Sequence, residues 1–397
     1  MSESTDPERV AWAYVSTVAQ GPSRAIEELI ASRGVVDAAA SMRIGDVPKP
    51  VWNRISARAH LDTAQQNLDA VASVGGRLVV PSDDEWPAWR FLGYENRGYE
   101  NRGYENRGYA GPNLDTKDSG GPLALWVVGS APVRELADRA VAVVGTRAAT
   151  SYGEHVTAEI AGDLAVDGWT VVSGGAYGID GAAHRAALGV GGRTVAVLAC
   201  GVDRAYPAGH ARLLRQIADS GAVISEYAPG TMPARYRFLA RNRVVAALSD
   251  GVVIVEAGWR SGARNTASWA RSLGRPVMAV PGPVTSASST GCHRMIRENE
   301  ARLVTGARDV AAEVGLMGTG ADDDDVQDSL FGKDVDRLPA TPARVLDAFP
   351  ASGARSVQEL SVDSGVPVSA VRSALVVLEI EGHARRDETG WFRVQRV

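Results

Sequence analysis

The chain has 397 residues, more than one compact domain usually holds, so we expect two or three domains. Its net charge of −5 taken alone argues against a basic nucleic-acid-binding surface, and two cysteines are too few for a disulfide framework or a cysteine-based zinc site. The sequence shows no apolar signal segment and no run of about 18 apolar residues. We therefore expect a cytoplasmic protein with no membrane contact, no metal and no cofactor.

The negative charge has a local origin. Residues 318–337 contain seven aspartates against Lys333 and Arg337, and this segment alone carries −5. The rest of the chain is neutral, with 40 acidic and 40 basic residues. Its arginines gather in two stretches that contain no acid, 235–243 and 260–275. The net charge therefore describes an acidic segment and does not exclude a nucleic-acid-binding surface elsewhere.

The N-terminal region reads as helical. Residues 8–73 are rich in Ala, Leu, Ile and Arg, with short breaks at glycines and prolines, which predicts a small helical domain over 1–75 of the SAM/HhH-like kind. Residues 76–92 read as a short connecting stretch.

A tandem repeat follows. The pentapeptide GYENR occurs three times at 93–107, and Gly108-Tyr109 comes next. Tyrosines interleaved with arginines could stack bases and contact phosphates. Each unit is nevertheless neutral and lacks an apolar face, so it cannot form a core. We favour a flexible, glycine-rich surface loop over 93–121.

Residues 123–315 alternate short apolar runs with helix-length amphipathic stretches. This alternation predicts a Rossmann-like α/β domain over 76–316, with a parallel sheet covered by helices on both faces. A ligand would then lie at the carboxyl ends of the strands. The predicted strands are 123–128, 140–144, 170–172, 194–199, 222–224, 252–255 and 277–280.

The acidic segment 317–338 reads as a linker, and residues 339–397 form a third pattern. Helices are expected near 342–349, 356–364 and 369–381, followed by a hairpin that turns at Thr389-Gly390. A helix-turn-helix with a β-hairpin is typical of a winged-helix domain. Its acids and bases balance, so duplex binding, protein contact and a structural role all stay open.

Two loops at strand ends could hold a phosphate. Glycines at a strand-to-helix turn let a ligand approach the backbone, and N–H groups at a helix start attract an anion. The alternative is that the glycines only permit tight turns. An NAD fingerprint and a Walker A motif are both absent. The candidate residues are Gly145, Thr146, Arg147, Ser173, Gly174, Gly175, Tyr177 and Gly178.

The stretch 235–243 (RYRFLARNR) offers four arginines and two aromatic residues. Arginines supply phosphate contacts, and an exposed aromatic ring offers a surface for stacking a base. Phe238 suits either this role or the core. Arg241 and Arg243 lie about 200° apart on a helix, so both cannot reach one phosphate and one could instead pair internally.

Carboxylates give weak signs of catalysis. Glu256, at a strand end, is the one carboxylate well placed for acid–base chemistry, but it has no evident partner. Asp180 and His184 are four residues apart on one helix, which favours a helix cap and its neighbour over a catalytic pair.

Six motifs follow one another along the central part of the chain. They are VAVVGTR at 141–147, SGGAYGIDGAAHRAAL at 173–188, VLACGVDRAYP at 197–207, ISEYAPG at 224–230, RNRVVAALSDGVVIVEA at 241–257 and VPGPV followed by Gly291-Cys292. Together these motifs resemble the bacterial DNA-processing protein A (DprA, or Smf) family. The match covers about 123–305 and agrees with the flanking domains. Members of that family are not enzymes; they bind single-stranded DNA, dimerise through the Rossmann-like domain and load the RecA recombinase during natural transformation.

The resemblance implies specific contacts with single-stranded DNA. It assigns phosphates to Arg147, to the 173–178 loop and to Arg241 with its neighbours Asn242 and Arg243, and it places Phe238 against a base.

This sequence departs from the family pattern at several positions. Tyr177 stands where many members have Arg or Lys, Leu-Ala follows Phe238 in place of Pro-x, and His293 stands where Asn is usual. The loop 261–266 also differs and adds Arg264. Either weaker binding or compensation by Arg264 and Arg237 would follow.

The leading hypothesis is a recombination mediator that protects incoming single-stranded DNA and loads RecA, acting as a homodimer and not as an enzyme. The alternative is a nucleotide-binding sensor, or a nucleoside-monophosphate phosphoribohydrolase of the related lysine-decarboxylase-like group with Glu256 as its carboxylate. The PGGxGTxxE loop of that group is absent here. A nucleotide-sensing winged-helix regulator is a third possibility.

Overall fold

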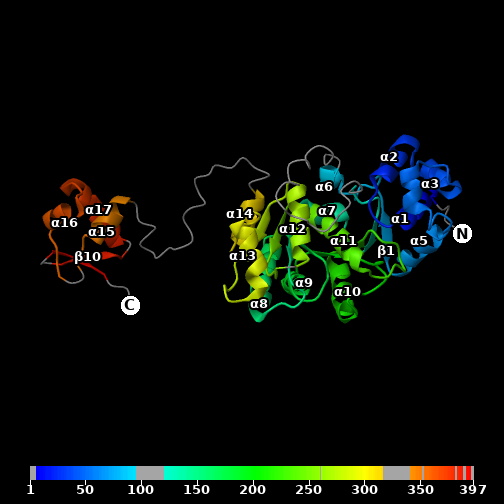
Figure 1. Ribbon diagram of the computed structural model, residues 1–397. Coiled ribbons are helices and arrows are strands. Elements are labelled where there is room, and N and C mark those ends of the chain that lie inside the picture. The colour runs from blue at the N-terminus through cyan, green and yellow to red at the C-terminus, as the bar shows by residue number, and fades with distance from the viewer. Residues whose placement is uncertain are drawn as a thin grey trace. The chain divides into compact units, whose positions relative to one another are not determined.

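The computed structural model has two compact units, Met1–Thr319 and Gly320–Val397, which are described separately (Figure 1). It describes residues 6–94, 120–259, 261–315, 340–350, 353–380, 382–387 and 390–394.

Five helices form the N-terminal part of the first unit over the described residues 6–75. Asp6 caps the first of them by accepting a hydrogen bond from the Glu8 backbone N–H at 3.0 Å. Their apolar side chains share one hydrophobic core with residues of the first two strands, including Leu78 and Trp126. The helical region is confirmed, whereas a domain boundary at residue 75 stays a prediction, because the packing is continuous across it. The helices are α1 (Pro7–Ala19), α2 (Arg24–Arg33), α3 (Val35–Ile44), α4 (Lys49–Ile55) and α5 (Ala64–Ser73).

Within the described residues, the sheet has nine strands in the order β1-β2-β6-β5-β4-β3-β7-β8-β9. The seven strands from β6 to β9 in this order are mutually parallel, as predicted. β1 and β2 extend the sheet in antiparallel fashion, which the expectation of a parallel sheet did not include. The strands are β1 (Gly76–Val79), β2 (Leu125–Val128), β3 (Ala140–Val144), β4 (Thr170–Ser173), β5 (Thr194–Leu198), β6 (Ala222–Ser225), β7 (Gly251–Ile254), β8 (Val277–Ala279) and β9 (Arg302–Leu303).

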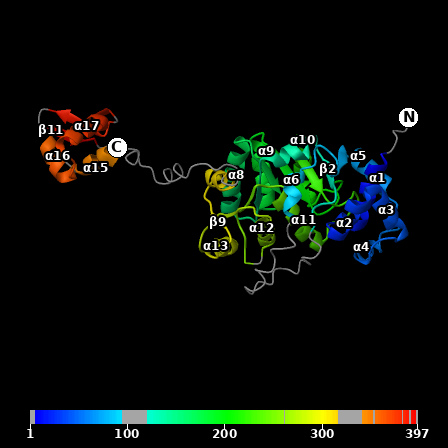
Figure 2. The ribbon, with the colours of Figure 1, turned by 90° about the horizontal axis from the view of Figure 1, so that it is seen from above.

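Helices cover both faces of the sheet, which explains why its central strands are apolar throughout. Val141 and Val143 of β3 face a core built with α8 (Ser151–Val166), α9 (Ile179–Gly189) and α14 (Ala307–Gly315). Ala142 and Val144 alternate with them and face the core on the other side, which includes residues of α11 (Arg235–Ala247) and α12 (Ala263–Ser272). Figure 2 shows α8, α9 and α10 (Ala211–Ser220) along one side of the sheet, with α11, α12 and α13 (Thr290–Arg297) along the other.

The strand order locates a binding crevice. The chain builds outward from β3 through β4, β5 and β6, then crosses back and adds β7, β8 and β9 on the opposite side of β3. Connections on the two sides therefore lead away from each other between β3 and β7. In open α/β sheets the ligand crevice lies at such a switch point, outside the carboxyl ends of the strands.

The first tyrosine of the repeat corrects one expectation. Tyr94 does not lie in a surface loop; it is buried in the core, and its hydroxyl donates to the backbone oxygen of Arg243 at 2.8 Å. α6 (Ala88–Phe91) precedes it and α7 (Val133–Asp138) follows β2. The expectation of a flexible loop over the rest of the repeat concerns residues 95–119, and the expected acidic linker 317–338 likewise falls outside the described residues.

The second unit has the predicted winged-helix order. α15 (Ala340–Asp347), α16 (Val357–Ser364) and α17 (Val368–Ile380) precede a hairpin of β10 (Ala384–Asp387) and β11 (Gly390–Arg393). A capping box at Ser356 and Glu359 begins α16. No single helix among the described residues is long and apolar enough to cross a membrane, although α16 and α17, bent by 104°, pass that test of length and composition together.

Candidate nucleic-acid interface

A cavity of about 500 Å³ opens at the carboxyl ends of the central strands, where the topology places a ligand crevice. It brings together the loops after β3, β4 and β7 and the first turns of α11. The predicted site residues in its lining are Gly145, Thr146, Arg147, Gly174, Phe238, Arg241 and Asn242, joined by Ala176, Asp180, Gly258, Ser261 and Gly262 among others.

Arg147 and Phe238 form the part of this cavity most suited to a nucleotide. The Arg147 side chain is exposed, and its guanidinium carbon lies 4.9 Å from the centre of the Phe238 ring. Phe238 is half-buried, so part of its ring remains open beside the cation. Tyr206, which is 40% exposed, packs against the same ring with centroids 5.4 Å apart. A cation beside two aromatic rings offers a phosphate contact and base stacking in one place.

Tyr206 is a residue that the sequence analysis missed. It follows β5, about 30 residues before Phe238, and nothing in the local pattern marks it as exposed. The Tyr-Pro pair belongs to the resemblance motif at 197–207, which was the one available sign of it.

Asp180 shapes the loop after β4. Its buried carboxylate accepts hydrogen bonds from the backbone N–H groups of Gly174 at 3.1 Å and Ala176 at 3.4 Å. Burial raises the pKa of this carboxyl above its usual range, while the nearby Arg241 guanidinium opposes the rise. Two N–H groups that we expected to face an anion are therefore used inside the loop. The expectation that Asp180 caps the helix was wrong: the N-cap of α9 is Gly178, and Asp180 lies inside the helix and binds the preceding loop.

Gly145 and Gly178 hold the loops close together, and a Cβ atom on Gly145 would overlap the Glu256 backbone oxygen. Gly178 has φ +74°, and a Cβ atom there would overlap the backbone oxygen of Thr146. The Ile179 N–H then donates to that same oxygen at 3.2 Å, and the Thr146 N–H donates to the Glu256 backbone oxygen at 2.8 Å. The glycines serve close packing, and they bring the ends of β3, β4 and β7 into one surface.

Arg241 lies at the base of the cavity. It is 5% exposed, and its Nη1 donates to the backbone oxygen of Val197 at 2.7 Å. Burial lowers the pKa of its guanidinium, and Asp180 acts in the opposite direction. Gly174 packs directly against it, since a Cβ atom there would overlap the guanidinium. Asn242 reaches across to Asn265 Oδ1 at 3.3 Å.

The structure does not place all the predicted arginines in this cavity. Arg243 is 1% exposed and pairs with Glu226, so its predicted phosphate contact was wrong and it is the arginine that pairs internally. Arg264 lies 3.9 Å from the Glu300 carboxylate. Arg237 contacts the Met232 backbone oxygen and Gln20. Compensation at the cavity by Arg237 or Arg264 therefore has no support from the geometry.

Besides Gly178, three residues of the predicted loop lie outside the lining. Ser173 is buried and donates to the Val143 backbone oxygen at 2.7 Å, and Gly175 is buried with φ +67°. Tyr177 is half exposed and meets the His210 ring edge-on at 4.7 Å. Each supports the loop from outside the cavity.

Glu256 serves the fold. It is buried, and its carboxylate accepts from the Thr150 backbone N–H at 3.0 Å and from the Thr150 hydroxyl at 2.6 Å, which anchors the start of α8. It does not line the cavity. The nucleotide-hydrolase alternative needs a carboxylate that reaches the substrate, and the Glu256 carboxylate is buried and already bound by Thr150. The described residues also contain no cluster of three or more metal-ligating side chains.

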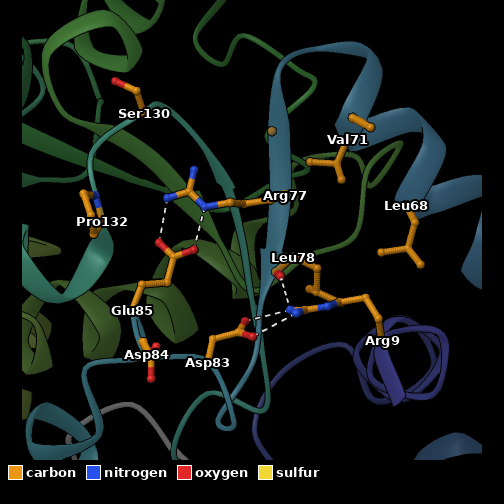
Figure 3. A pocket seen from close by; sticks show the side chains of 12 residues that line it. Arg9, Leu68, Val71, Arg77, Leu78, Asp83, Asp84, Glu85, Ser130 and Pro132 are labelled. Carbon is orange, nitrogen blue, oxygen red and sulfur yellow. Dashed lines mark hydrogen bonds and ion pairs between the residues drawn. The ribbon is translucent and has the colours of Figure 1, made fainter. Parts of the chain in front are cut away.

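A second cavity, of about 860 Å³, lies beside β1 and the N-terminal helices (Figure 3). Its arginines are already paired: Arg9 with Asp83 at 2.7 Å and Arg77 with Glu85 at 2.6 Å. Figure 3 shows both pairs, and the Arg9 guanidinium also donates to the Leu78 backbone oxygen. These groups join the helices to the sheet edge and leave little positive charge for a nucleic acid.

Comparison with known proteins agrees with this fold and site. A model of the family DNA recombination-mediator protein A matches residues 104–315, just over half of the chain. A model of the DprA winged helix domain matches residues 334–388. The chain belongs to the DprA family.

Individual relatives extend the match along most of the chain. A DprA of Mycobacterium tuberculosis is 46% identical over 387 residues, which cover 97% of this chain and 94% of its own. Protein Smf of Escherichia coli is 36% identical over 276 residues, or 69% of this chain and 72% of its own. The X-ray structure of DprA from Streptococcus pneumoniae superposes with a TM-score of 0.59 at 30% identity, covering 78% of this chain and 99% of that one. A DNA-processing role follows from the family.

Proposed function

We propose that the cavity at the carboxyl ends of the strands binds single-stranded DNA. The observation that carries this proposal is the exposed Arg147 guanidinium lying over the half-buried Phe238 ring, with Tyr206 beside it. A base must be unpaired to stack on such rings, and stacking tolerates any base because each has a π face. The ligand of this arrangement is therefore a single strand of unrestricted sequence.

Family membership supports a proposal for the role in the cell. We propose that the protein acts as a homodimer without catalytic activity, protects incoming single-stranded DNA and loads RecA onto it during natural transformation. The matched family is described as a recombination mediator, and the matched relatives as DNA-processing proteins, which supports this assignment.

Fluorescence anisotropy with labelled oligo-dT tests the binding. We expect salt-dependent affinity for the full chain and a loss of several-fold or more in Arg147→Glu. Arg215→Glu is the matched control, because Arg215 is exposed on α10 and does not line the cavity. Equal losses in both variants, or no binding by the unaltered protein at low salt, would refute the proposal. The RecA step is tested separately, by the rate of RecA ATP hydrolysis on oligo-dT with and without the protein.

A further inference from the structure

A large indole ring stands exposed beside the cavity and has no role in the site described so far. Trp259 lies in the loop between β7 and α12, and 55% of its surface is accessible. Gly258, just before it, and Ser261, two residues after it, line the cavity. Single exposed apolar residues are common on protein surfaces, so the contacts of the ring must show whether it is held for a purpose.

One face of the ring is held by a fixed cation. The Arg294 guanidinium carbon, from α13, lies 4.4 Å from the centre of the Trp259 ring. The Arg294 side chain is only 15% exposed, and its Nε donates to both carboxylate oxygens of Glu298 at 2.9 and 3.0 Å. The indole therefore rests on a guanidinium that is itself anchored, so little side-chain freedom is left for a ligand to remove.

The strand order places Trp259 at the same edge of the sheet as Arg147 and Tyr206. Tyr206 follows β5, Arg147 follows β3, and Trp259 follows β7, which is the next strand after β3. Neighbouring strands lie about 4.8 Å apart, so Trp259 continues the row of binding groups by one strand along the same edge of the sheet. Arg294, on the helix that follows β8, lies further along in the same direction.

We propose that Trp259, supported from beneath by Arg294, is a second base-stacking position that receives a nucleotide beyond those held at Phe238. This inference rests on the proposed single-strand binding at the cavity and extends its footprint toward β8. The occupant is an unpaired base of the same strand. An exposed π face can stack the base of a nucleotide, and the neighbouring phosphate-binding site can hold the phosphate of the same chain.

Oligonucleotide length separates this position from the main cavity. Oligo-dT of about 5 nucleotides and of about 15 nucleotides are titrated against the unaltered protein, Trp259→Ala and Trp259→Phe. We expect Trp259→Ala to bind the short strand normally and the long strand at least about fivefold more weakly, since stacking one base contributes about 1–3 kcal/mol. Trp259→Phe keeps an aromatic face and should restore most of the loss.

The control is Trp52→Ala, because Trp52 is a partly exposed indole of α4 in the helical region. It should bind both lengths as the unaltered protein does, and thermal melts should show all variants folded. If Trp259→Ala binds both lengths normally, the second stacking position is refuted while the proposed function stands. If the unaltered protein binds neither length, the proposed function fails and this inference with it. Normal DNA binding with a changed mass in light scattering would make Trp259 a protein contact instead.

Discussion

Removing the Arg147 guanidinium should change how the affinity for single-stranded DNA depends on salt. The described residues offer Arg147 no carboxylate within ion-pair distance, and its guanidinium lies over Phe238, so its charge is available to a phosphate. For single strands, each neutralised phosphate contributes about −0.7 to the slope of log affinity against log salt concentration. Arg147→Ala should therefore flatten the slope by about 0.7.

The same slope of about 0.7 determines how much affinity Arg147→Ala loses at each salt concentration. Between 1 M and 0.1 M salt, a slope of about 0.7 corresponds to about a fivefold change in affinity. We expect Arg147→Ala to weaken binding about fivefold at 0.1 M and hardly at all at 1 M. Arg147→Lys keeps the charge and should keep the slope. Phe238→Ala removes stacking, so it should cost about 1–3 kcal/mol at every salt concentration with the slope unchanged.

Anisotropy titrations of oligo-dT at four or more salt concentrations separate the two effects. Arg147 is exposed and Phe238 is half-buried, so we expect both variants to fold. Thermal melts check that each variant remains folded. A loss in Arg147→Ala that is the same at every salt concentration would refute a phosphate contact. A flattened slope in Phe238→Ala would refute the separation of charge from stacking.

Three further predictions concern buried groups. Burial holds the pKa of His184 at about 3, so below pH 6.5 the unfolded chain binds a proton that the folded protein does not. As the pH falls from 6.5 to 3, the free energy of unfolding should thus fall by up to about 1.4 kcal/mol per pH unit. The fall should be steeper than in His184→Gln. Equal dependence of the free energy of unfolding on pH in the two proteins, measured by urea titration, would contradict this. Glu226→Ala should lower the free energy of unfolding by about 3–5 kcal/mol, because it leaves Arg243 buried without its carboxylate. The double variant Glu226→Leu, Arg243→Leu should recover much of that loss in urea titrations. A double variant no more stable than Glu226→Ala would contradict this. Asp180→Ala should weaken oligo-dT binding about tenfold or more by releasing the loop after β4, because hydrogen bonds to a charged acceptor contribute about 1.5–3 kcal/mol. Unaltered affinity would show that the loop does not position DNA.

Much of the fold could be predicted because its strands are short, apolar and separated by helices. All seven predicted strands occur, but β1 and β9 were missed. β9 has two residues, Arg302 and Leu303, both exposed, so no apolar run marks it. β1 opens on Gly76 and includes Arg77, whose side chain pairs with Glu85 and so becomes compatible with a sheet edge. Pairing between distant residues overrode the local pattern in that strand.

The site was predicted less completely than the fold. Helical phase separated Arg241 from Arg243, but it could not show which of them had a partner, because Glu226 lies just after β6, 17 residues away in the sequence. The aromatic contact of Phe238 with Tyr206 likewise depends on the first turn of α11 meeting the loop after β5 in space. Residue types predicted the chemistry of the site, whereas the assignment of each side chain depended on tertiary contacts.

Photocrosslinking tests the central claim most directly. An oligo-dT strand carrying 5-iododeoxyuridine is irradiated on the full-length protein, and the crosslinked residues are identified by mass spectrometry. We predict crosslinks at Phe238 and Tyr206, the rings that lie together at the cavity. Crosslinks confined to the winged-helix domain, or to the second cavity beside β1, would contradict the assignment of single-strand binding to the carboxyl ends of the strands.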